Sequence, residues 1–239
     1  MKAGFNSADP GNSVVKAADI ALFAGLNEEE CKLIDEASQT SSYERGDTVF
    51  NSGDPAEYFF VVQSGRMKVY FLQKDGREQI LYIYGAGDFI GGLNLVQETD
   101  YIYTAETLED TLIVRIAKNA FLSVLQSNLT VKEKVMDQLW MRLRWAEGLV
   151  GRLSMPEAEN RVAQLLLDLI PEYGRQTARG IWLPLTLTQD EMGNFTGLTR
   201  ETVTRQLRRL VKDGLIQMER GKGILLPDPA WLKDRINQV

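Results

Sequence analysis

Residues 188–212 read TQDEMGNFTGLTRETVTRQLRRLVK, and this stretch decides the fold of the C-terminal part of the chain. It opens with a capping box, in which the Thr188 hydroxyl takes one free backbone N–H and Glu191 returns a second hydrogen bond. The short helix that follows ends at Gly197, because glycine suits the positive φ of a tight helix terminus. Thr199 then caps a second helix over 200–212. Two helices joined by a short glycine-containing turn predict a helix-turn-helix.

The second helix has two different faces. Val203, Leu207 and Leu210 point inward, whereas the opposite face carries arginine, glutamate and threonine. Arginine can bind guanine through two hydrogen bonds, and glutamate can accept from the cytosine amino group. A solvated charged surface is the alternative interpretation, but it leaves the caps and the turn glycine unexplained. We therefore predict contacts to double-stranded DNA from Thr188, Gln189, Thr199, Arg200, Glu201, Thr202, Thr204, Arg205 and Arg208.

A β-hairpin is expected directly after these helices. Its strands are Ile216–Met218 and Ile224–Leu226, joined across Gly221-Lys222-Gly223. Such a hairpin is the wing of a winged helix-turn-helix, and Lys222 at its turn is predicted to contact a DNA phosphate.

Composition excludes most catalytic chemistry. The 239 residues include no histidine and a single cysteine, Cys31. These counts exclude a Ser-His-Asp triad, a proximal-His haem and a four-cysteine metal site within one chain. No phosphate-cradling P-loop is present, so we predict no catalytic and no metal-binding residues. Cys31 follows three glutamates, which favours a packed small residue over a redox switch.

Charge and hydropathy place the chain in the cytoplasm. The net charge is −6, but residues 154–239 hold 12 Lys and Arg against 11 Asp and Glu, whereas the remainder holds 15 against 22. A basic surface is therefore expected only in the C-terminal third. Residues 1–10 lack the pattern of a signal peptide, and no apolar run is long enough to span a membrane.

The N-terminal half shows short strands separated by glycines. Several runs of β-branched and aromatic residues occur without a helix-sized insertion, so we predict an antiparallel sheet structure in which Tyr58–Val62 is a central strand. Lys74-Asp75-Gly76 is the expected turn of a hairpin. The expected strands are Thr48–Phe50, Tyr58–Gln63, Met67–Leu72, Gln79–Tyr84, Tyr101–Thr107 and Thr111–Ile116.

A heptad pattern follows the strands. Apolar residues recur at alternating steps of three and four, which is typical of a two-stranded coiled coil between identical chains. An amphipathic helix packed on its own domain is the alternative. The predicted dimer seam consists of Met136, Leu139, Leu143, Ala146, Val150 and Leu153.

These patterns predict an α+β protein. Pro156 ends the heptad helix, a further helix is expected over 157–170, and 174–180 is expected to be a polar loop. The predicted order is a flexible segment 1–20, a sensing β-roll of the double-stranded jelly-roll type 21–118, a dimerisation helix region 119–154, and a winged helix-turn-helix 155–239.

The chain resembles the Crp–Fnr superfamily of transcription regulators over about residues 20–227. Arg45-Gly46-Asp47, residues 50–54 and residues 85–91 are similar to turns of that family's cyclic-nucleotide-binding β-roll. Residues 198–205, LTRETVTR, are similar to its recognition-helix signature. The resemblance implies a homodimer on a palindromic site. The set that reads TGTGA-like half-sites in cyclic-AMP receptors is matched here by Arg200, Glu201 and Arg205. Thr204 stands where the Fnr branch, which reads TTGA-like half-sites, has serine. We therefore expect each half-site of this protein to contain TGA, which both branches share.

The sequence departs from the family at the effector site. Cyclic-AMP receptors have Gly-Glu-Leu and Arg-Ser-Ala where this chain has Gly91-Gly92-Leu93 and Tyr103-Thr104-Ala105. Loss of the arginine removes a charge-assisted contact to the cyclic phosphate, about 1.5–3 kcal/mol. We therefore expect no response to cyclic AMP. The single cysteine and the absence of histidine likewise argue against the iron–sulfur cluster and the haem that other branches of the family carry. Gly91, Gly92, Leu93, Tyr103 and Thr104, together with Tyr101, either shape a pocket for another small molecule or fill it.

The sequence thus predicts a bacterial DNA-binding regulator whose partners are double-stranded DNA, a second copy of the chain and RNA polymerase, with an unidentified small molecule as effector and no membrane. A different hypothesis is an effector-binding module that acts through protein partners and keeps a vestigial DNA-binding domain. An intact set of Arg200, Glu201 and Arg205 argues against that hypothesis.

Overall fold

The computed structural model describes residues 15–97, 99–184, 187–219 and 223–237. The chain divides into two compact units, one made of residues 1–71 and 82–141 and the other of residues 72–81 and 142–239. One boundary falls within a continuous helix, and the other two assign the hairpin segment 72–81 to the second unit. None of the helices in the described ranges is long and apolar enough to cross a membrane.

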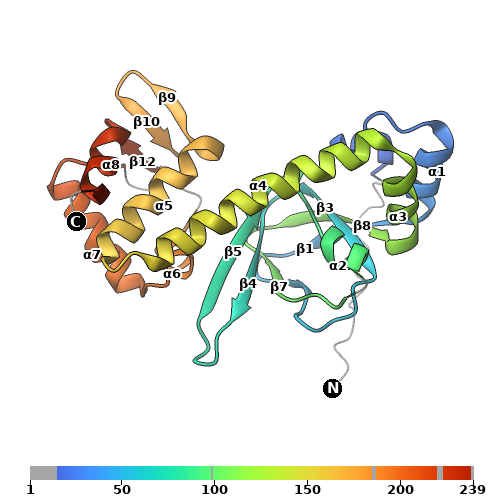
Figure 1. The fold of residues 1–239 in the computed structure, drawn as a ribbon, viewed down its shortest axis with the longest axis horizontal. Coiled ribbons are helices and arrows are strands. Elements are labelled where there is room, and N and C mark those ends of the chain that lie inside the picture. Colours follow the sequence, from blue (N-terminus) through green and yellow to red (C-terminus); the bar gives the residue numbers. More distant parts are fainter. Residues whose placement is uncertain (1–14, 98, 185–186, 220–222, 238–239) are drawn as a thin grey trace. The chain divides into compact units, whose positions relative to one another are not determined.

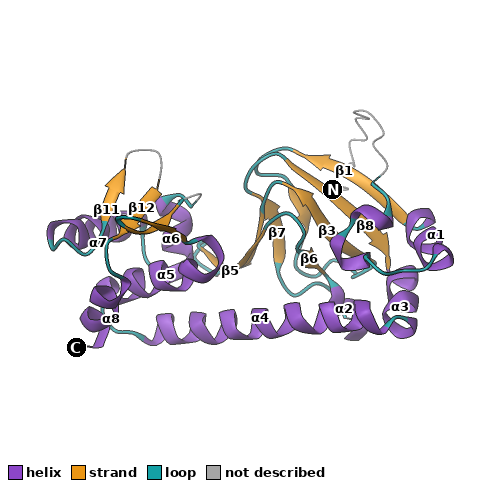
Figure 2. Cartoon of the chain, turned by 90° about the horizontal axis from the view of Figure 1, so that it is seen from above, coloured by secondary structure: helices purple, strands orange, loops and turns teal. Residues whose placement is uncertain are grey.

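The first unit is built on a β-roll of two four-stranded sheets, with strand orders β1-β8-β3-β6 and β2-β7-β4-β5 (Figure 2). All register-defined pairs in these sheets are antiparallel, and β3 lies inside its sheet, as predicted. The strands are β1 (Ser38–Tyr43), β2 (Thr48–Phe50), β3 (Tyr58–Ser64), β4 (Met67–Leu72), β5 (Glu78–Tyr84), β6 (Phe89–Ile90), β7 (Thr104–Thr107) and β8 (Thr111–Ala117).

The predicted hairpin turn joins β4 to β5. Gly76 has a φ of +83°, and the amide of Gln73 donates to the carbonyl of Arg77 at 2.8 Å. Two strands of the roll, β1 and β6, were not predicted. β1 reads SQTSSY and has no apolar alternation, and β6 has only two residues, so neither leaves a pattern that periodicity detects.

Helices cover one end of the roll (Figure 1). Phe59 of β3 stacks on Phe121 at 3.7 Å between ring centroids, and Val131 and Val135 complete this core. The elements are the 3-10 turns η1 (Ala17–Asp19) and η2 (Ala21–Phe23), and the helices α1 (Glu28–Glu36), α2 (Gly92–Gln97), α3 (Lys118–Ser127) and α4 (Leu129–Ser154).

The prediction of a flexible segment 1–20 is wrong for its last residues, while residues 1–14 lie outside the described part. Ala17 and Ile20 are buried in the core, and the amide of Ala17 donates to Asp35 at 2.6 Å. Ala17 and Ile20 are only two apolar residues within a polar stretch, so their burial could not be predicted from the sequence pattern. Cys31 of α1 is half-buried against the same core.

The second unit combines helices with a small sheet of order β11-β12-β10-β9. Its core joins α5 to α7 through Val162, Leu166, Val203 and Leu207, all nearly fully buried. The elements are α5 (Ala158–Tyr173), β9 (Arg175–Thr177), β10 (Gly180–Leu183), α6 (Gln189–Thr196), α7 (Arg200–Lys212), β11 (Gln217–Glu219), β12 (Gly223–Leu226) and α8 (Pro229–Asn237).

The expected polar loop 174–180 is instead largely a hairpin. β9 is exposed throughout and pairs with β10, with Gln176 opposite Ile181. Its stability comes from backbone pairing rather than from buried side chains, so it leaves no apolar pattern. The preceding helix, expected to end at Ile170, continues through Pro171 to Tyr173.

Gly180 is expected to be essential for this sheet. Its φ is +124°, and a Cβ there would lie 2.2 Å from the carbonyl oxygen of Leu226. We expect Gly180→Ala to lower the free energy of unfolding by about 2–4 kcal/mol, because backbone strain and overpacking add. Urea denaturation followed by tryptophan fluorescence measures this loss.

Gly214→Ala is the matched control for that substitution. Gly214 also has positive φ, +75°, but nothing lies within 4 Å of a Cβ there. Its substitution should cost only about 1 kcal/mol. Equal losses for the two variants would show that the close approach to Leu226 has no energetic consequence.

Candidate nucleic-acid interface

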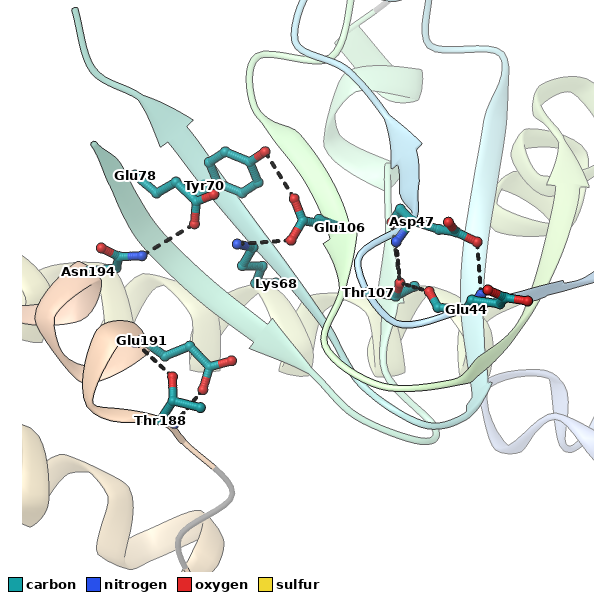
Figure 3. A network of polar contacts seen from close by, with 10 residues as sticks. All are labelled: Glu44, Asp47, Lys68, Tyr70, Glu78, Glu106, Thr107, Thr188, Glu191 and Asn194. Carbon is teal, nitrogen blue, oxygen red and sulfur yellow. Dashed lines mark hydrogen bonds and ion pairs between the residues drawn. The ribbon is translucent and has the colours of Figure 1, made fainter. Parts of the chain in front are cut away.

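The first helix of the motif, α6, begins at the predicted capping box. The amide of Glu191 donates to the Thr188 hydroxyl at 3.2 Å, and the amide of Thr188 donates to the Glu191 carboxylate at 2.6 Å (Figure 3). Two orphan amides at the helix start are thereby satisfied. Thr188 is exposed and Gln189 half-buried at this end of the helix.

A tight turn connects α6 to α7. Gly197 has a φ of +66° in the left-handed region, as predicted. Gly193 of α6 lets the backbone of Leu198 approach this helix closely, because a Cβ on Gly193 would lie 2.6 Å from the carbonyl oxygen of Leu198. Thr199 caps α7 by accepting from the amide of Thr202 at 3.3 Å. These contacts fix the start of α7 relative to α6.

The exposed face of α7 gathers the predicted reading residues. They line a shallow, open depression formed by Arg200, Glu201, Thr204, Arg205 and Arg208. Hydrogen bonds from its own backbone amide and from Thr199 hold the pKa of Glu201 below its ordinary value. This carboxylate is therefore ionised at neutral pH and can act only as an acceptor.

The opposite face of α7 is anchored within the unit. Val203, Leu207 and Leu210 are at most 1% exposed, as predicted. The carboxylate of Glu159 on α5 pairs with Arg209 of α7 at 2.8 Å and with Arg235 of α8 at 2.7 Å. Arg235 extends the network to Asp213. The helix thus presents its polar face from a fixed support.

The first turn of α6 contacts the reading face at two points. The Thr204 hydroxyl lies 2.5 Å from the Gln189 side-chain oxygen, and Arg200 pairs with Asp190 at 3.5 Å. Sequence analysis did not detect Asp190. No spacing rule links it to Arg200, because the contact depends on how two helices pack. Both side chains of that ion pair are more than 60% exposed, so the pair contributes little to stability.

The expected wing is present as the antiparallel pair β11–β12, with Met218 opposite Ile224. Two further strands, β10 and β9, extend the sheet beyond β12. The predicted phosphate contact, Lys222, lies outside the described residues.

The region predicted as an effector pocket contains an aromatic stack. Tyr101 is 3% exposed and stacks on Phe50 at 4.1 Å, and its hydroxyl donates to the carbonyl of Tyr58 at 2.7 Å. Burial raises the pKa of Tyr101 to about 12. The ring centroids of Tyr103 and Phe50 lie 6.0 Å apart. The Tyr101 ring thus fills space within the roll.

The other predicted pocket residues lie directly before α2, at its start and at the start of β7. A Cβ at Gly91 would lie 2.9 Å from the Tyr58 carbonyl oxygen, and one at Gly92 would lie 3.4 Å from the Phe59 ring. The Thr104 hydroxyl accepts from the amide of Ser52 at 3.2 Å. The side chain of Leu93 is outside the described part of the structure.

The predicted seam of α4 is largely uncovered. Met136, Leu143 and Val150 are 50%, 49% and 66% exposed, and Ala146 is exposed with them. Two predicted members differ, since Leu139 packs against the core of its own unit and Leu153 is half-buried beside Gly197. A heptad pattern does not separate these two uses of leucine. Trp140, which was not predicted, is 58% exposed next to the seam.

A β-roll followed by a long helix and a winged helix-turn-helix defines a class of DNA-binding proteins. Residues 40–128 match the family model of the cyclic nucleotide-binding domain, and residues 160–235 match that of the Crp-like helix-turn-helix domain.

Individual relatives agree with these matches. The probable transcriptional regulator flp of Lacticaseibacillus casei is 30% identical over 91% of this chain and 96% of its own length. A CRP-like cAMP-activated global transcriptional regulator of Mycobacterium tuberculosis is 28% identical over 91% and 97%. The solved structure of FixK2 from Bradyrhizobium japonicum aligns with a TM-score of 0.70 at 26% identity, covering 82% of this chain and 96% of that one.

The chain belongs to the Crp–Fnr family of transcription regulators. It is a DNA-binding regulator and not an enzyme.

Proposed function

We propose that the protein acts in the cytoplasm as a homodimer that binds a palindromic DNA site with TGA-containing half-sites. The observation that carries this proposal is the exposed face of α7, where Arg200, Glu201 and Arg205 lie side by side on a buried support. Arginine suits guanine, and the ionised Glu201 suits the cytosine paired with it. These residues support DNA reading rather than a vestigial domain.

The uncovered seam of α4 supports the dimer. Met136, Leu143 and Val150 form an apolar stripe that the described chain does not bury, and a parallel pair of such helices would cover it. A dimer would place two recognition helices in successive major grooves, about 34 Å apart. RNA polymerase is the proposed protein partner once the dimer is on DNA.

A binding titration tests the proposal. The full-length protein is titrated against a duplex with two inverted TGA half-sites, and against the same duplex with one half-site scrambled. We expect sedimentation to show a dimer, and scrambling one half-site to weaken binding at least tenfold. Equal affinity for both duplexes would contradict the palindromic site, and a monomer on the intact duplex would contradict the dimer.

The signal sensed by the β-roll is proposed to be something other than cyclic AMP. One relative is described as cAMP-activated, but this chain has Gly92 and Tyr103 where the family's two charged ligands stand. The buried ring of Tyr101 further reduces the room inside the roll. A different ligand would then shift the population between two dimer geometries, one whose recognition helices match the spacing of the half-sites and one whose helices do not.

We expect cyclic AMP to have no effect on DNA binding. Without a guanidinium at position 103, the cyclic phosphate would lose the charge-assisted contact that compensates for its desolvation. Calorimetry with millimolar cyclic AMP should show no saturable heat, and the DNA titration should be unchanged in its presence. Saturable binding together with a rise in DNA affinity would overturn this expectation.

A further inference from the structure

The contact between Gln189 and Thr204 joins the two helices of the motif at the reading face. The Thr204 hydroxyl lies 2.5 Å from the Gln189 side-chain oxygen and 2.8 Å from the carbonyl oxygen of Arg200. The first acceptor comes from α6, and the second comes from the preceding turn of α7 itself. Both residues are half-buried, and Thr204 lines the depression on α7.

The hydroxyl group has only one proton to donate. Two protein acceptors, the Gln189 side-chain oxygen and the Arg200 carbonyl oxygen, compete for that proton, and the hydroxyl oxygen keeps its lone pairs to accept a hydrogen bond. The bond to Arg200 is the ordinary back-bond of a threonine within a helix. The distance from the Thr204 hydroxyl to the Gln189 oxygen is the shorter of the two, and this contact depends on how α6 packs against α7.

We propose that Gln189 is a specificity-determining positioning residue, which holds the Thr204 proton so that Thr204 presents only an acceptor to DNA. Thr204 would then favour a base with an exocyclic amino group, adenine N6 or cytosine N4, over guanine O6 or thymine O4. This inference rests on the proposed function, because it assumes that α7 lies in the major groove. It adds a second layer of recognition that belongs to α6.

A double-mutant cycle tests this role of Gln189. The wild type, Thr204→Val, Gln189→Ala and the double variant are titrated against half-sites that carry each of the four bases at the position where Thr204→Val changes preference. We expect the wild type to favour amino-bearing bases by about 3- to 10-fold, the range of one net hydrogen bond. Thr204→Val should abolish this preference, and Gln189→Ala should at least halve it.

The double variant separates the proposed role from a phosphate contact. Because Gln189 acts through the Thr204 hydroxyl, Gln189→Ala should cause no further change of preference in the Thr204→Val background. Gln189→Glu keeps an acceptor and should keep the preference, although its added charge weakens binding to all sequences. A uniform loss with Gln189→Ala in both backgrounds would overturn the proposal.

Asp190→Ala is the matched control, because Asp190 lies in the same turn of α6 but contacts Arg200. It should leave the preference at the Thr204 position unchanged, and a change equal to that of Gln189→Ala would also overturn the proposal. Thr204→Ala also removes the hydroxyl, so it replaces Thr204→Val in the cycle if the valine variant does not fold. A wild-type protein that shows no preference for the TGA core would contradict the proposed function. A normal TGA preference, combined with a Gln189→Ala substitution that leaves the preference at the Thr204 position unchanged, would contradict only this inference.

Discussion

Replacing Arg205 by alanine is expected to weaken binding to the correct half-site by about 1–3 kcal/mol, roughly 5- to 150-fold, and to flatten the preference at one guanine. Arg205 is exposed on α7 one helical turn beyond Glu201, so both side chains can reach one half-site. A guanidinium can donate to guanine N7 and O6 together, and no other base offers this pair of acceptors. Titration against a panel of half-site variants at two salt concentrations measures the effect.

Lys222→Ala supplies the contrast for that measurement. Lys222 is predicted from the sequence to contact phosphate at the wing, so its loss should weaken all sequences alike and reduce the salt slope by roughly 1. Arg205→Ala should instead act on one base position. If Arg205→Ala weakened every sequence equally, Arg205 would be a phosphate contact and the assignment from the family would fail at this residue.

The helix-turn-helix could be predicted to the residue because its signals are local. Thr188 and Glu191 form a box within one turn, Gly197 marks a required positive φ, and Thr199 caps the helix that follows. Each of these depends on chemistry within a few residues of chain. Inward and outward faces then follow from the helical period alone.

Features that depend on packing between elements escaped prediction. β1 and β9 are polar or exposed strands whose partners lie far along the chain or supply only backbone bonds. Leu139 and Leu143 occupy similar heptad positions, yet only Leu139 packs on the core of its own unit. The proximity of Gln189 to Thr204 likewise arises from the angle between α6 and α7, which the residue types do not encode locally.

The aromatic stack in the roll illustrates an alternative that sequence left open. Tyr101 and Tyr103 are separated by one residue, and either could have shaped or filled the expected pocket. Tyr101 is buried because its hydroxyl finds the backbone of Tyr58, both as donor and as acceptor, while its ring stacks on Phe50. Tyr103 remains half-exposed. The two hydrogen bonds to the Tyr58 backbone therefore account for the burial of Tyr101 rather than Tyr103, and Tyr58 lies 43 residues away along the chain.

The largest effect is expected from Leu143→Asp on α4. Leu143 is 49% exposed in the single chain and belongs to the uncovered stripe with Met136 and Val150. In a dimer, two facing aspartates would be buried without partners, which costs several kcal/mol. We expect monomers at micromolar concentration in sedimentation. Because a dimer binds its two half-sites cooperatively, affinity for the palindrome should fall about 100- to 10,000-fold.

Arg144→Asp controls for the added negative charge in this experiment. Arg144 is exposed, and it follows Leu143 at a heptad position outside the seam, so its substitution changes the charge by more without entering the contact. It should remain dimeric and should lose far less affinity for the palindrome. Leu143→Asp should also keep the native far-ultraviolet circular dichroism, since Leu143 makes no part of either unit's buried core. A Leu143→Asp protein that stays dimeric and binds the palindrome would remove Leu143 from the interface, and the exposed stripe of α4 would then need a different partner.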